Sequence, residues 1–406
     1  MSQSLNATRT AGLAAMKTFI PAMGKFYTAG RNFDQGPGNH TAVSMLSPYL
    51  SRRLLTEQEV VQAAISVHGY ESAEKFVQEV IWRGYFKGWL ERRPQVWSSY
   101  CNGLTTDLQA LNLDRRLRKN VTSAMEGQTG LTCFDAWVDE LLKTGYLHNH
   151  ARMWFASSWI FTLKLPWRLG ADFFYRHLLD GDAASNTLSW RWVAGLHTRG
   201  KPYAATASNI ATFTDQRVTP QSTDFARNIE GLENSEPNGL PPVRPLREFN
   251  NPQMNQPTAL LITDEDCHLE DFDLDSLDIY TIGSLEASHL RSPLHIADSI
   301  LDFEGAALSD AASRIGVKAI KLKADHPENL VNWALASGAT QIVTPYVTRG
   351  PLHDWLEQAK PAFSRAEITF CEWRRDWDSA IWPYTTAGFF KVKKQVRSII
   401  EQIPSI

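Results

Sequence analysis

The sequence predicts a two-domain protein, in which an N-terminal all-α domain is followed by a C-terminal α/β domain with a doubly wound, parallel, Rossmann-like sheet. Apolar residues recur every three or four positions from about Ala14 to Val193, as in amphipathic helices. Beyond Pro257, short β-type runs alternate with helical patterns, which is typical of parallel sheets with right-handed crossovers. The length, 406 residues, also exceeds what one hydrophobic core usually organises.

The helices of the first half have recognisable start and stop residues. Thr56 is the predicted N-cap of a helix in which Glu59 completes a capping box, and this helix is expected to end near Gly69. The next helix is expected to stop before Pro94, which cannot continue it. A later helix is predicted to end at Gly145, since glycine readily adopts the left-handed C-cap conformation.

The segment from Thr219 to Pro257 separates the two patterns. It is rich in Pro, Asn and Gly and has little periodicity, which is typical of a linker. We therefore expect a helical domain at residues 1–218, a linker at 219–257 and the α/β domain at 258–406. The predicted strands are "TALLIT" (258–263), "LDIYTIG" (277–283), "VKAIKLKA" (317–324), "TQIVTPYV" (340–347) and "EITFCEW" (367–373), and the predicted helices cover 293–315, 327–337, 352–363 and 389–403.

Charge, cysteine content and the length of apolar runs exclude several protein classes. The formal net charge of -3 argues against wholesale attraction to nucleic acid or anionic lipid, although it allows a local basic surface. The four cysteines are far apart, so neither a metal site nor a disulfide framework is predicted. No signal peptide is recognisable, and no apolar run is long enough to span a bilayer. We expect a cytoplasmic monomer without membrane contact.

A polar stripe interrupts the apolar pattern in "GYLHNHARMWFASSW". Asn149, Arg152 and Met153 share one face of the predicted helix, where an ordinary core helix presents Leu or Ile. The stripe indicates either a polar ligand or an internal ion pair of Arg152 with Asp135 or Asp139.

Polar residues also mark two predicted helix starts. In "LLDGDAASNTLSWRW", Asp182 is the predicted N-cap of a helix that carries Asn186 and Trp190 on one face. Capping does not account for Asn186, whose amide suits a heteroaromatic ring because it both donates and accepts hydrogen bonds. Ser44 and Ser47 precede another helix start, so they are either plain caps or part of a phosphate site.

The first half of the chain contains six segments in a recognisable order and spacing: "YTAGR", "SMLSPYLS", "EVIWR", "EGQTG", "GYLHNHARM" and "LLDGDAASNTLSWRW". Together they resemble the FAD-binding helical domain of the photolyase/cryptochrome flavoprotein family, over a stretch from about Tyr27 to Tyr203. The resemblance implies a helical FAD-binding domain with FAD as the cofactor. Within the family, the residue types are most similar to those of deoxyribodipyrimidine photolyases, which repair cyclobutane pyrimidine dimers.

The resemblance also implies roles for individual residues. Trp190 and Trp167 match the first two members of the family's photoreducing chain of three tryptophans. Positions that meet the dimer in repair enzymes are matched by Glu79, Trp82, Asn149, Met153 and Trp192. The residues implied to hold FAD are Tyr27, Arg31, Ser44, Met45, Leu46, Ser47, Arg83, Asn149, Arg152, Asp180, Asp182 and Asn186, with Asn186 beside flavin N5.

The reaction that the resemblance implies is a light-driven repair of UV-damaged DNA. A photoexcited reduced flavin donates an electron to a dimer flipped out of the duplex, and the electron returns after the ring splits, so no general base is required. Glu79 is expected to hydrogen-bond the dimer, while Trp82 and Trp192 form flat walls around it. DNA phosphates are expected to meet a basic rim formed by Arg31, Arg83, His150, Arg191, Arg199 and Lys201.

Two departures from the family pattern leave an alternative function open. The segment "LQALNLDRRL" has no tryptophan where the third member of the photoreducing chain is expected, and Trp97 or Tyr100 are possible substitutes. The α/β antenna-like domain precedes the FAD domain in typical members but follows it here, as in a circular permutation, and nothing in it identifies a second, antenna chromophore. The alternative is a cryptochrome-like blue-light photoreceptor that binds FAD but has lost DNA repair. A flavoprotein without photochemistry is the third hypothesis.

Overall fold

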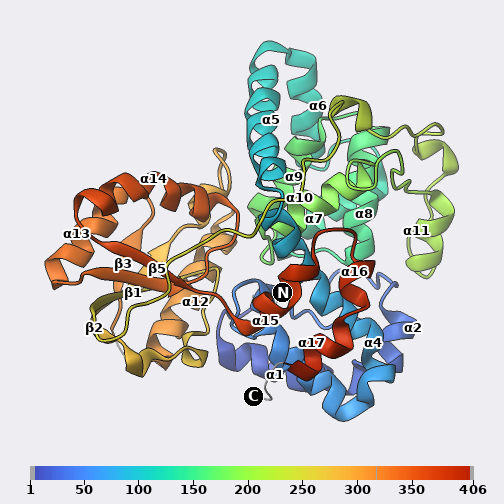
Figure 1. Cartoon of the computed structure of the whole chain (residues 1–406). Coiled ribbons are helices and arrows are strands. Elements are labelled where there is room, and N and C mark those ends of the chain that lie inside the picture. Colours follow the sequence, from blue (N-terminus) through green and yellow to red (C-terminus); the bar gives the residue numbers. More distant parts are fainter. Residues whose placement is uncertain (1–4, 317, 403–406) are drawn as a thin grey trace.

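The structure, a computed structural model, describes residues 5–316 and 318–402 and confirms the two-domain fold class (Figure 1). Val317 of the third predicted strand and Ile403 of the last predicted helix lie outside this part of the chain. No helix within it is long and apolar enough to cross a membrane. The α-helices of the first half are α1 (Arg9–Phe19), α2 (Lys25–Gly30), α3 (Ser47–Ser51), α4 (Glu57–Glu91), α5 (Pro94–Leu113), α6 (Arg115–Met125), α7 (Thr132–Thr144), α8 (Asn149–Ser157), α9 (Trp167–His177), α10 (Ala183–Val193) and α11 (Ala207–Phe213).

Helix α4 begins where the sequence predicts, and it has a kink at Gly69, where one helix was expected to end. The Thr56 hydroxyl accepts from the backbone N–H of Glu59 (3.3 Å), and the Glu59 carboxylate accepts from the backbone N–H of Thr56 (2.8 Å), so the capping box is confirmed. Gly69, with φ 69° and ψ 157°, divides α4 into two helical pieces at a kink, a conformation open to glycine because it lacks a Cβ. The second piece runs through the centre of the helical domain.

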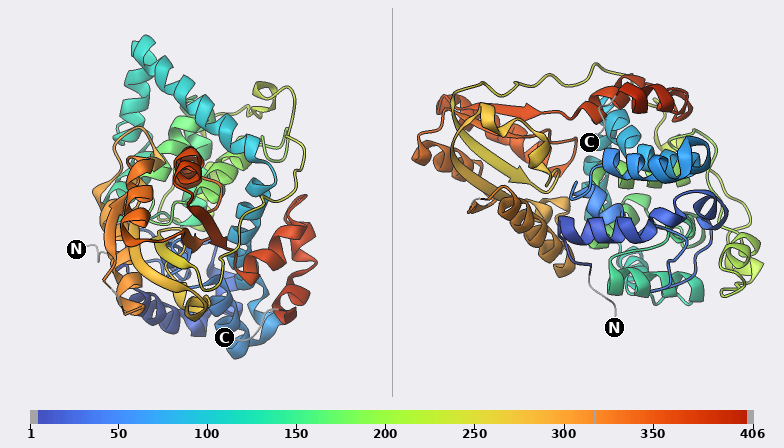
Figure 2. Two further views of the ribbon diagram at one scale, coloured as in Figure 1. Left: turned by 60° about the vertical axis from the view of Figure 1, so that its left-hand side comes forward. Right: turned by 90° about the horizontal axis from the view of Figure 1, so that it is seen from below.

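The C-terminal domain contains a parallel sheet with the strand order β3-β2-β1-β4-β5. Alternate residues of β1 face opposite layers. Leu260 and Ile262 belong to the same apolar core as α12 and the helical domain, whereas Ala259 and Leu261 pack with α13 and α14. Figure 2 shows helices on both faces of the sheet. The bounds are β1 (Pro257–Thr263), β2 (Asp278–Glu286), β3 (Ile320–Lys323), β4 (Gln341–Pro345), β5 (Thr369–Trp373), α12 (Asp298–Arg314), α13 (Pro327–Ser337) and α14 (Pro351–Arg365).

The chain after β5 leaves the sheet and packs on the helical domain. Helices α15 (Asp376–Ile381), α16 (Phe390–Lys393) and α17 (Val396–Gln402) lie beside α4 (Figures 1 and 2). Gly88 permits this contact, because a Cβ there would lie 2.5 Å from Trp382 Cδ1. The helix predicted at 389–403 is therefore two helices, and the turn between them keeps both Val392 and Val396 buried. The domain limits at 218 and 258 stay predictions.

The predicted linker runs along the helical domain before it enters the sheet. The backbone N–H of Leu232 donates to Ala194 O (2.9 Å), and that of Arg244 donates to Arg92 O (2.8 Å). Asn250 then pairs with Cys371 in a parallel bridge beside β5. These contacts hold the connection against both domains.

Arg53 is a buried cation that joins three segments of the chain. Its guanidinium donates to Glu57 at the start of α4 (3.2 Å), to Asp266 after β1 (3.3 Å) and to both oxygens of Asp378 in α15 (2.8 Å each). Asp266 also accepts from Arg375 (2.6 and 2.8 Å). Burial lowers the pKa of Arg53, but the charge of Asp378 and then the other carboxylates outweigh it, so the net direction is upward and Arg53 stays charged.

We predict that Arg53→Ala lowers the free energy of unfolding by about 3–5 kcal/mol, because three carboxylates lose a buried cation. Chemical denaturation followed by circular dichroism measures this change. Lys143→Ala is the control, since its ion pair with Asp139 is exposed and should be worth less than about 1 kcal/mol. An equally small change for Arg53→Ala would show that the cluster does not hold the domains together.

Candidate functional site

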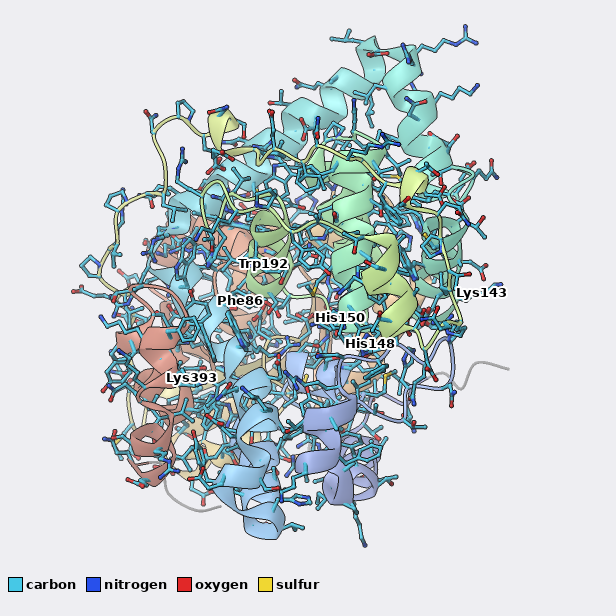
Figure 3. The ribbon with its side chains drawn as sticks, turned by 90° about the vertical axis from the view of Figure 1, so that its right-hand side faces the viewer. Phe86, Lys143, His148, His150, Trp192 and Lys393 are labelled. Carbon is cyan, nitrogen blue, oxygen red and sulfur yellow. The ribbon has the colours of Figure 1, made fainter. Side chains whose placement is uncertain are left out.

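One cavity of about 430 Å³ lies inside the helical domain, between α4, α8, α9 and α10. All five residues that were predicted to meet the dimer line it, and Figure 3 shows this side of the molecule with Trp192 and Phe86 labelled. The predicted site residues around the cavity are Glu79, Trp82, Arg83, Asn149, Arg152, Met153, Asp180, Asp182, Asn186, Trp190 and Trp192.

Other predicted residues do not line this cavity. Tyr27 packs in the core against Phe76 (5.1 Å between ring centroids), and Arg31 donates to Thr28 O (2.8 Å) at the end of α2. The loop before α3 turns sharply at Met45, whose φ of 55° is uncommon for a residue with a side chain. The predicted residues away from the cavity are Tyr27, Arg31, Ser44, Met45, Leu46, Ser47 and Trp167.

Two arginine–aspartate pairs form the polar wall of the cavity. Arg83 Nη1 lies 2.6 Å from Asp182 Oδ2, and Arg152 Nη2 lies 2.9 Å from Asp180 Oδ2. Burial raises the pKa of Asp180, but the charge and hydrogen bond of Arg152, together with the charge of Arg83 and a hydrogen bond from Ser47, outweigh it. The net direction of the pKa is downward, so Asp180 is ionised. The hypothesis that Arg152 pairs with Asp135 or Asp139 is wrong.

Those two acids have local partners on their own helix or turn. Asp135 accepts from the backbone N–H (3.0 Å) and the hydroxyl (2.7 Å) of Thr129, while Lys143 pairs with Asp139 one turn away. Arg152 is therefore left for Asp180, which is 28 residues distant in sequence.

Helix α10 presents its polar residues as the sequence predicts. Asp182 caps it by accepting from the backbone N–H of Ser185 (2.8 Å). Asn186 lines the cavity and donates one amide N–H to Ala171 O of α9 (2.8 Å), which fixes its orientation. Its position beside a flavin ring remains a proposal.

Trp82 has a partner that sequence reasoning missed. Phe389, just before α16, stacks on the Trp82 ring with 3.9 Å between centroids and 12° between planes. Gly84 brings the same segment close, since a Cβ there would lie 3.2 Å from Ile381 Cδ1. No local pattern could reveal Phe389, because it is more than 300 residues from Trp82. The i+4 spacing from Trp82 could have revealed Phe86, which also lines the cavity.

The basic rim differs from the prediction at one position. Arg191 is only 2% exposed and pairs with Glu236 (Nη2 to Oε2, 2.7 Å), so it is not available to DNA phosphates. His150, labelled in Figure 3, is half-buried. It stacks on Trp154 and contacts Asn32 O through Nδ1, and burial lowers its pKa. Its place in the rim stays a prediction.

Residues 76–228 match the family described as the FAD binding domain of DNA photolyase. This part of the helical domain is therefore similar to the FAD-binding domain of the photolyase/cryptochrome family. A deoxyribodipyrimidine photo-lyase of Thermus thermophilus is 34% identical over 201 residues, which are 48% of this chain and 44% of that protein. The chain spans less than half the length of the curated relatives it matches.

Two solved structures are also similar to this chain. A bacterial class III photolyase from Agrobacterium tumefaciens is 28% identical, with a TM-score of 0.43 over 51% of this chain and 43% of that one. A cryptochrome of Synechocystis is 26% identical, with a TM-score of 0.42 over 52% of this chain and 44% of that one.

The lining of the large cavity in the FAD-binding domain fits a flavin. Its walls combine the indoles of Trp82 and Trp190 with the amide of Asn186, as a flat heteroaromatic ring requires. Within the described residues, Trp190 Nε1 is buried at this cavity and has no hydrogen-bond partner. Since buried polar atoms are normally paired, an acceptor on a bound ligand would satisfy this N–H.

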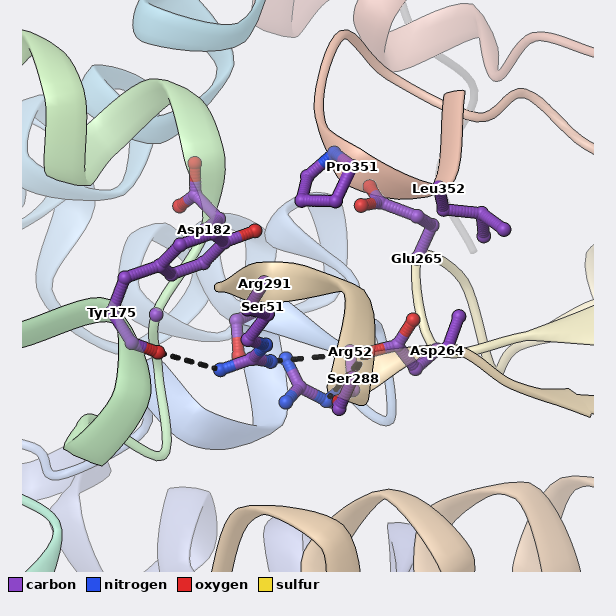
Figure 4. Close-up of a pocket in the computed structure, with 12 residues that line it drawn as sticks. Ser51, Arg52, Tyr175, Asp182, Asp264, Glu265, Ser288, Arg291, Pro351 and Leu352 are labelled. Atoms are coloured by element: carbon purple, nitrogen blue, oxygen red, sulfur yellow. Dashed lines mark hydrogen bonds and ion pairs between the residues drawn. The ribbon is translucent and has the colours of Figure 1, made fainter. Parts of the chain in front are cut away.

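A second, much smaller cavity lies where the two domains meet, at the carboxyl ends of β1 and β2 (Figure 4). Its volume of about 20 Å³ is close to the space of one water. Arg52 Nε (3.5 Å) and Arg291 Nη2 (3.8 Å) both approach Asp264 Oδ2, and Thr348 donates to Glu265 (2.8 Å). Parallel sheets often bind ligands at the carboxyl ends of their strands, and here protein side chains fill this place.

Glu304 of α12 is a buried carboxyl beside this small cavity. Its Oε1 accepts from the backbone N–H groups of Ala287 (2.7 Å) and Ser288 (2.8 Å). Burial, and next the charge of Asp264, raises the pKa of Glu304 to about 7. The folded protein therefore holds a proton there that the unfolded chain releases near its ordinary pKa of 4.5.

We predict that this proton makes the free energy of unfolding fall as the pH rises from about 4.5 to about 7, because the folded state binds more protons in that range. Glu304→Gln keeps the acceptor oxygen but cannot ionise. The free energy of unfolding of this variant should therefore fall less than that of wild type between about pH 4.5 and about pH 7. Urea denaturation of both proteins across the range measures the difference. The exposed Glu230→Gln is the control. Parallel curves for wild type and Glu304→Gln would refute the assignment.

Proposed function

We propose that the helical domain binds FAD in the cavity between α4, α8 and α10, and that the protein uses blue light to split cyclobutane pyrimidine dimers in DNA. The meeting of two residue sets around one cavity carries this proposal. Glu79 and Trp192, from the set assigned to the dimer, line it together with Asp180 and Asn186, from the set assigned to the flavin. A flavin in this cavity is therefore within reach of a flipped dimer.

The cavity residues supply binding and orientation rather than acid–base catalysis. FAD, when bound and reduced, supplies the electron that opens the dimer after light is absorbed. Trp82 and Trp192 offer indole faces to a flipped dinucleotide. Burial raises the pKa of Glu79, and this effect is stronger than the lowering by the charge of Arg31, whose Nε lies 3.9 Å from Glu79 Oε1. Glu79 therefore holds a proton more readily and can donate it in a hydrogen bond.

The polar wall is suited to hold the cofactor. The pairs Arg83–Asp182 and Arg152–Asp180 combine donors for phosphate or ribityl oxygens with acceptors for the ring N–H and sugar hydroxyls. Exposed lysines of the C-terminal segment add positive charge near Trp82, where the DNA backbone would approach. Lys393 marks this segment in Figure 3.

The test is repair of dimer-containing DNA under blue light, with a dark control, by purified protein whose flavin has been reduced chemically. We expect light-dependent repair. Its absence in protein shown to contain FAD contradicts the proposal. A light-dependent change of oligomeric state without DNA binding favours the photoreceptor instead.

We predict that Glu79→Gln lowers the repair yield about tenfold, because a charged or protonated carboxyl makes a stronger hydrogen bond than an amide. The yield per absorbed photon with saturating DNA measures this effect. Glu74→Gln is a control on the same helix, since Glu74 bonds to Gln78, lies 3.8 Å from Lys393 and does not line the cavity. Equal yields for the two variants would remove Glu79 from the proposed site.

We further predict that Phe389→Ala weakens binding of dimer-containing DNA about 3- to 10-fold, because an aromatic stack of this kind contributes about 0.5–1.5 kcal/mol and holds the Trp82 ring. A fluorescence titration with dimer-containing DNA measures the dissociation constant of each variant, and undamaged DNA serves as the reference ligand. The neighbouring Phe390→Ala is the control, since Phe390 is 76% exposed. The role of Phe389 is refuted if both variants bind like wild type.

A further inference from the structure

A row of aromatic rings leads from the large cavity toward the α/β domain. Trp190 lines the cavity and packs against α9 at Gly170, where a Cβ would lie 2.4 Å from Trp190 Cη2. Trp167 lies one turn before Gly170 on the same helix. Tyr100 of α5 is 5.9 Å from Trp167, and Trp97 stacks on Tyr100 at 5.3 Å with 29° between planes. The four rings are all buried.

Only one of these four rings has a hydrogen-bond partner for its polar group among the described residues. Within the described residues, Trp190 Nε1, Trp167 Nε1 and the Tyr100 hydroxyl are buried and have no hydrogen-bond partner. Trp97 Nε1 instead donates to Asp354 Oδ2 (2.7 Å). Asp354 lies at the start of α14 in the α/β domain, and its side chain is 44% exposed, so a proton on it can reach solvent.

This difference decides where an oxidised ring is trapped. Loss of an electron from an indole makes its N–H strongly acidic, but the proton leaves only if an acceptor is in contact. At Trp167 no acceptor contacts the indole N–H among the described residues. The guanidinium of Arg168, which pairs with Asp107 (3.6 Å), lies 5.0 Å from the ring and cannot take a proton. At Trp97 the carboxylate both attracts the positive charge and takes the proton.

We propose that Tyr100 and Trp97 take the place of the missing third tryptophan in photoreduction, and that Asp354 is the proton acceptor. One electron passes from Trp97 through Tyr100, Trp167 and Trp190 to a photoexcited, oxidised flavin, while the Trp97 Nε1 proton moves to Asp354 Oδ2. The resulting neutral Trp97 radical is restored by an added thiol, which gives one electron and one proton. The inference rests on the FAD-binding part of the proposed function and not on repair.

The arrangement gives the α/β domain a part in the photochemistry. Trp97 is on the helical domain and Asp354 is on the sheet domain, so the electron donor and the proton acceptor meet only when the domains are docked. The pair is also separate from the lesion side of the cavity, because neither Trp97 nor Asp354 lines it.

The experiment compares Trp97→Phe and Asp354→Asn with wild type, starting from oxidised flavin with a thiol present. We expect net flavin photoreduction to fall about tenfold in both variants, as for loss of one strong charge-assisted contact. Transient absorption should show the deprotonated tryptophan radical in wild type only, with a solvent deuterium effect on its formation. Trp137→Phe, a buried tryptophan outside the row, is the control.

Two further measurements separate a local effect from misfolding or loss of function. In 15N-labelled protein without flavin, the Trp97 indole resonance should shift in Asp354→Asn while other indoles stay in place, and Asp354→Glu should restore photoreduction. Chemically reduced variants should repair dimers like wild type, so failed repair would count against the proposed function alone. Wild-type photoreduction in Trp97→Phe, or an unshifted resonance in Asp354→Asn, overturns the inference.

Discussion

The buried charge of Arg53 is the constraint on which the placement of the other parts depends. A guanidinium in the interior is tolerated only where its hydrogen bonds and charge are matched, and here the matching carboxylates come from three separate segments. Glu57 opens α4, Asp266 follows the first strand, and Asp378 lies in the helix after the last strand. The helical domain, the sheet and the C-terminal segment must therefore meet at one point for the cation to be satisfied.

This meeting point also positions the candidate site. Helix α4 begins at the Arg53 cluster and carries Glu79, Trp82 and Arg83 to the cavity, while the chain after Asp378 returns along α4 and places Phe389 on the back of Trp82. One wall of the cavity is therefore assembled from segments at opposite ends of the sequence. A rigid wall matters because an aromatic platform binds a flipped base well only when its orientation is fixed beforehand.

The sequence predicted well what depends on neighbours within one or two turns. The capping box of Thr56 and Glu59 and the cap of Asp182 rest on local hydrogen bonds, and the five strands are short apolar or β-branched runs between helical patterns. The sequence-based prediction failed where a charged side chain has several candidate partners far apart in the sequence. Arg152 bonds to Asp180 rather than to the acids of α7, and Arg191 is paired with Glu236. Such choices follow tertiary distances, which periodicity does not contain.

The order of the two domains is a weaker constraint than the surfaces they present. The interface is built from contacts such as Trp97 with Asp354, Tyr346 with Glu91 and Arg52 with Asp264, and none of these requires a particular chain order. Order affects only the connection, and residues 219–257 supply one long enough to run along the helical domain into β1. Since rearranged chains keep a fold when the new junctions lie on the surface, a sheet domain placed after the helices can still dock on them through these contacts.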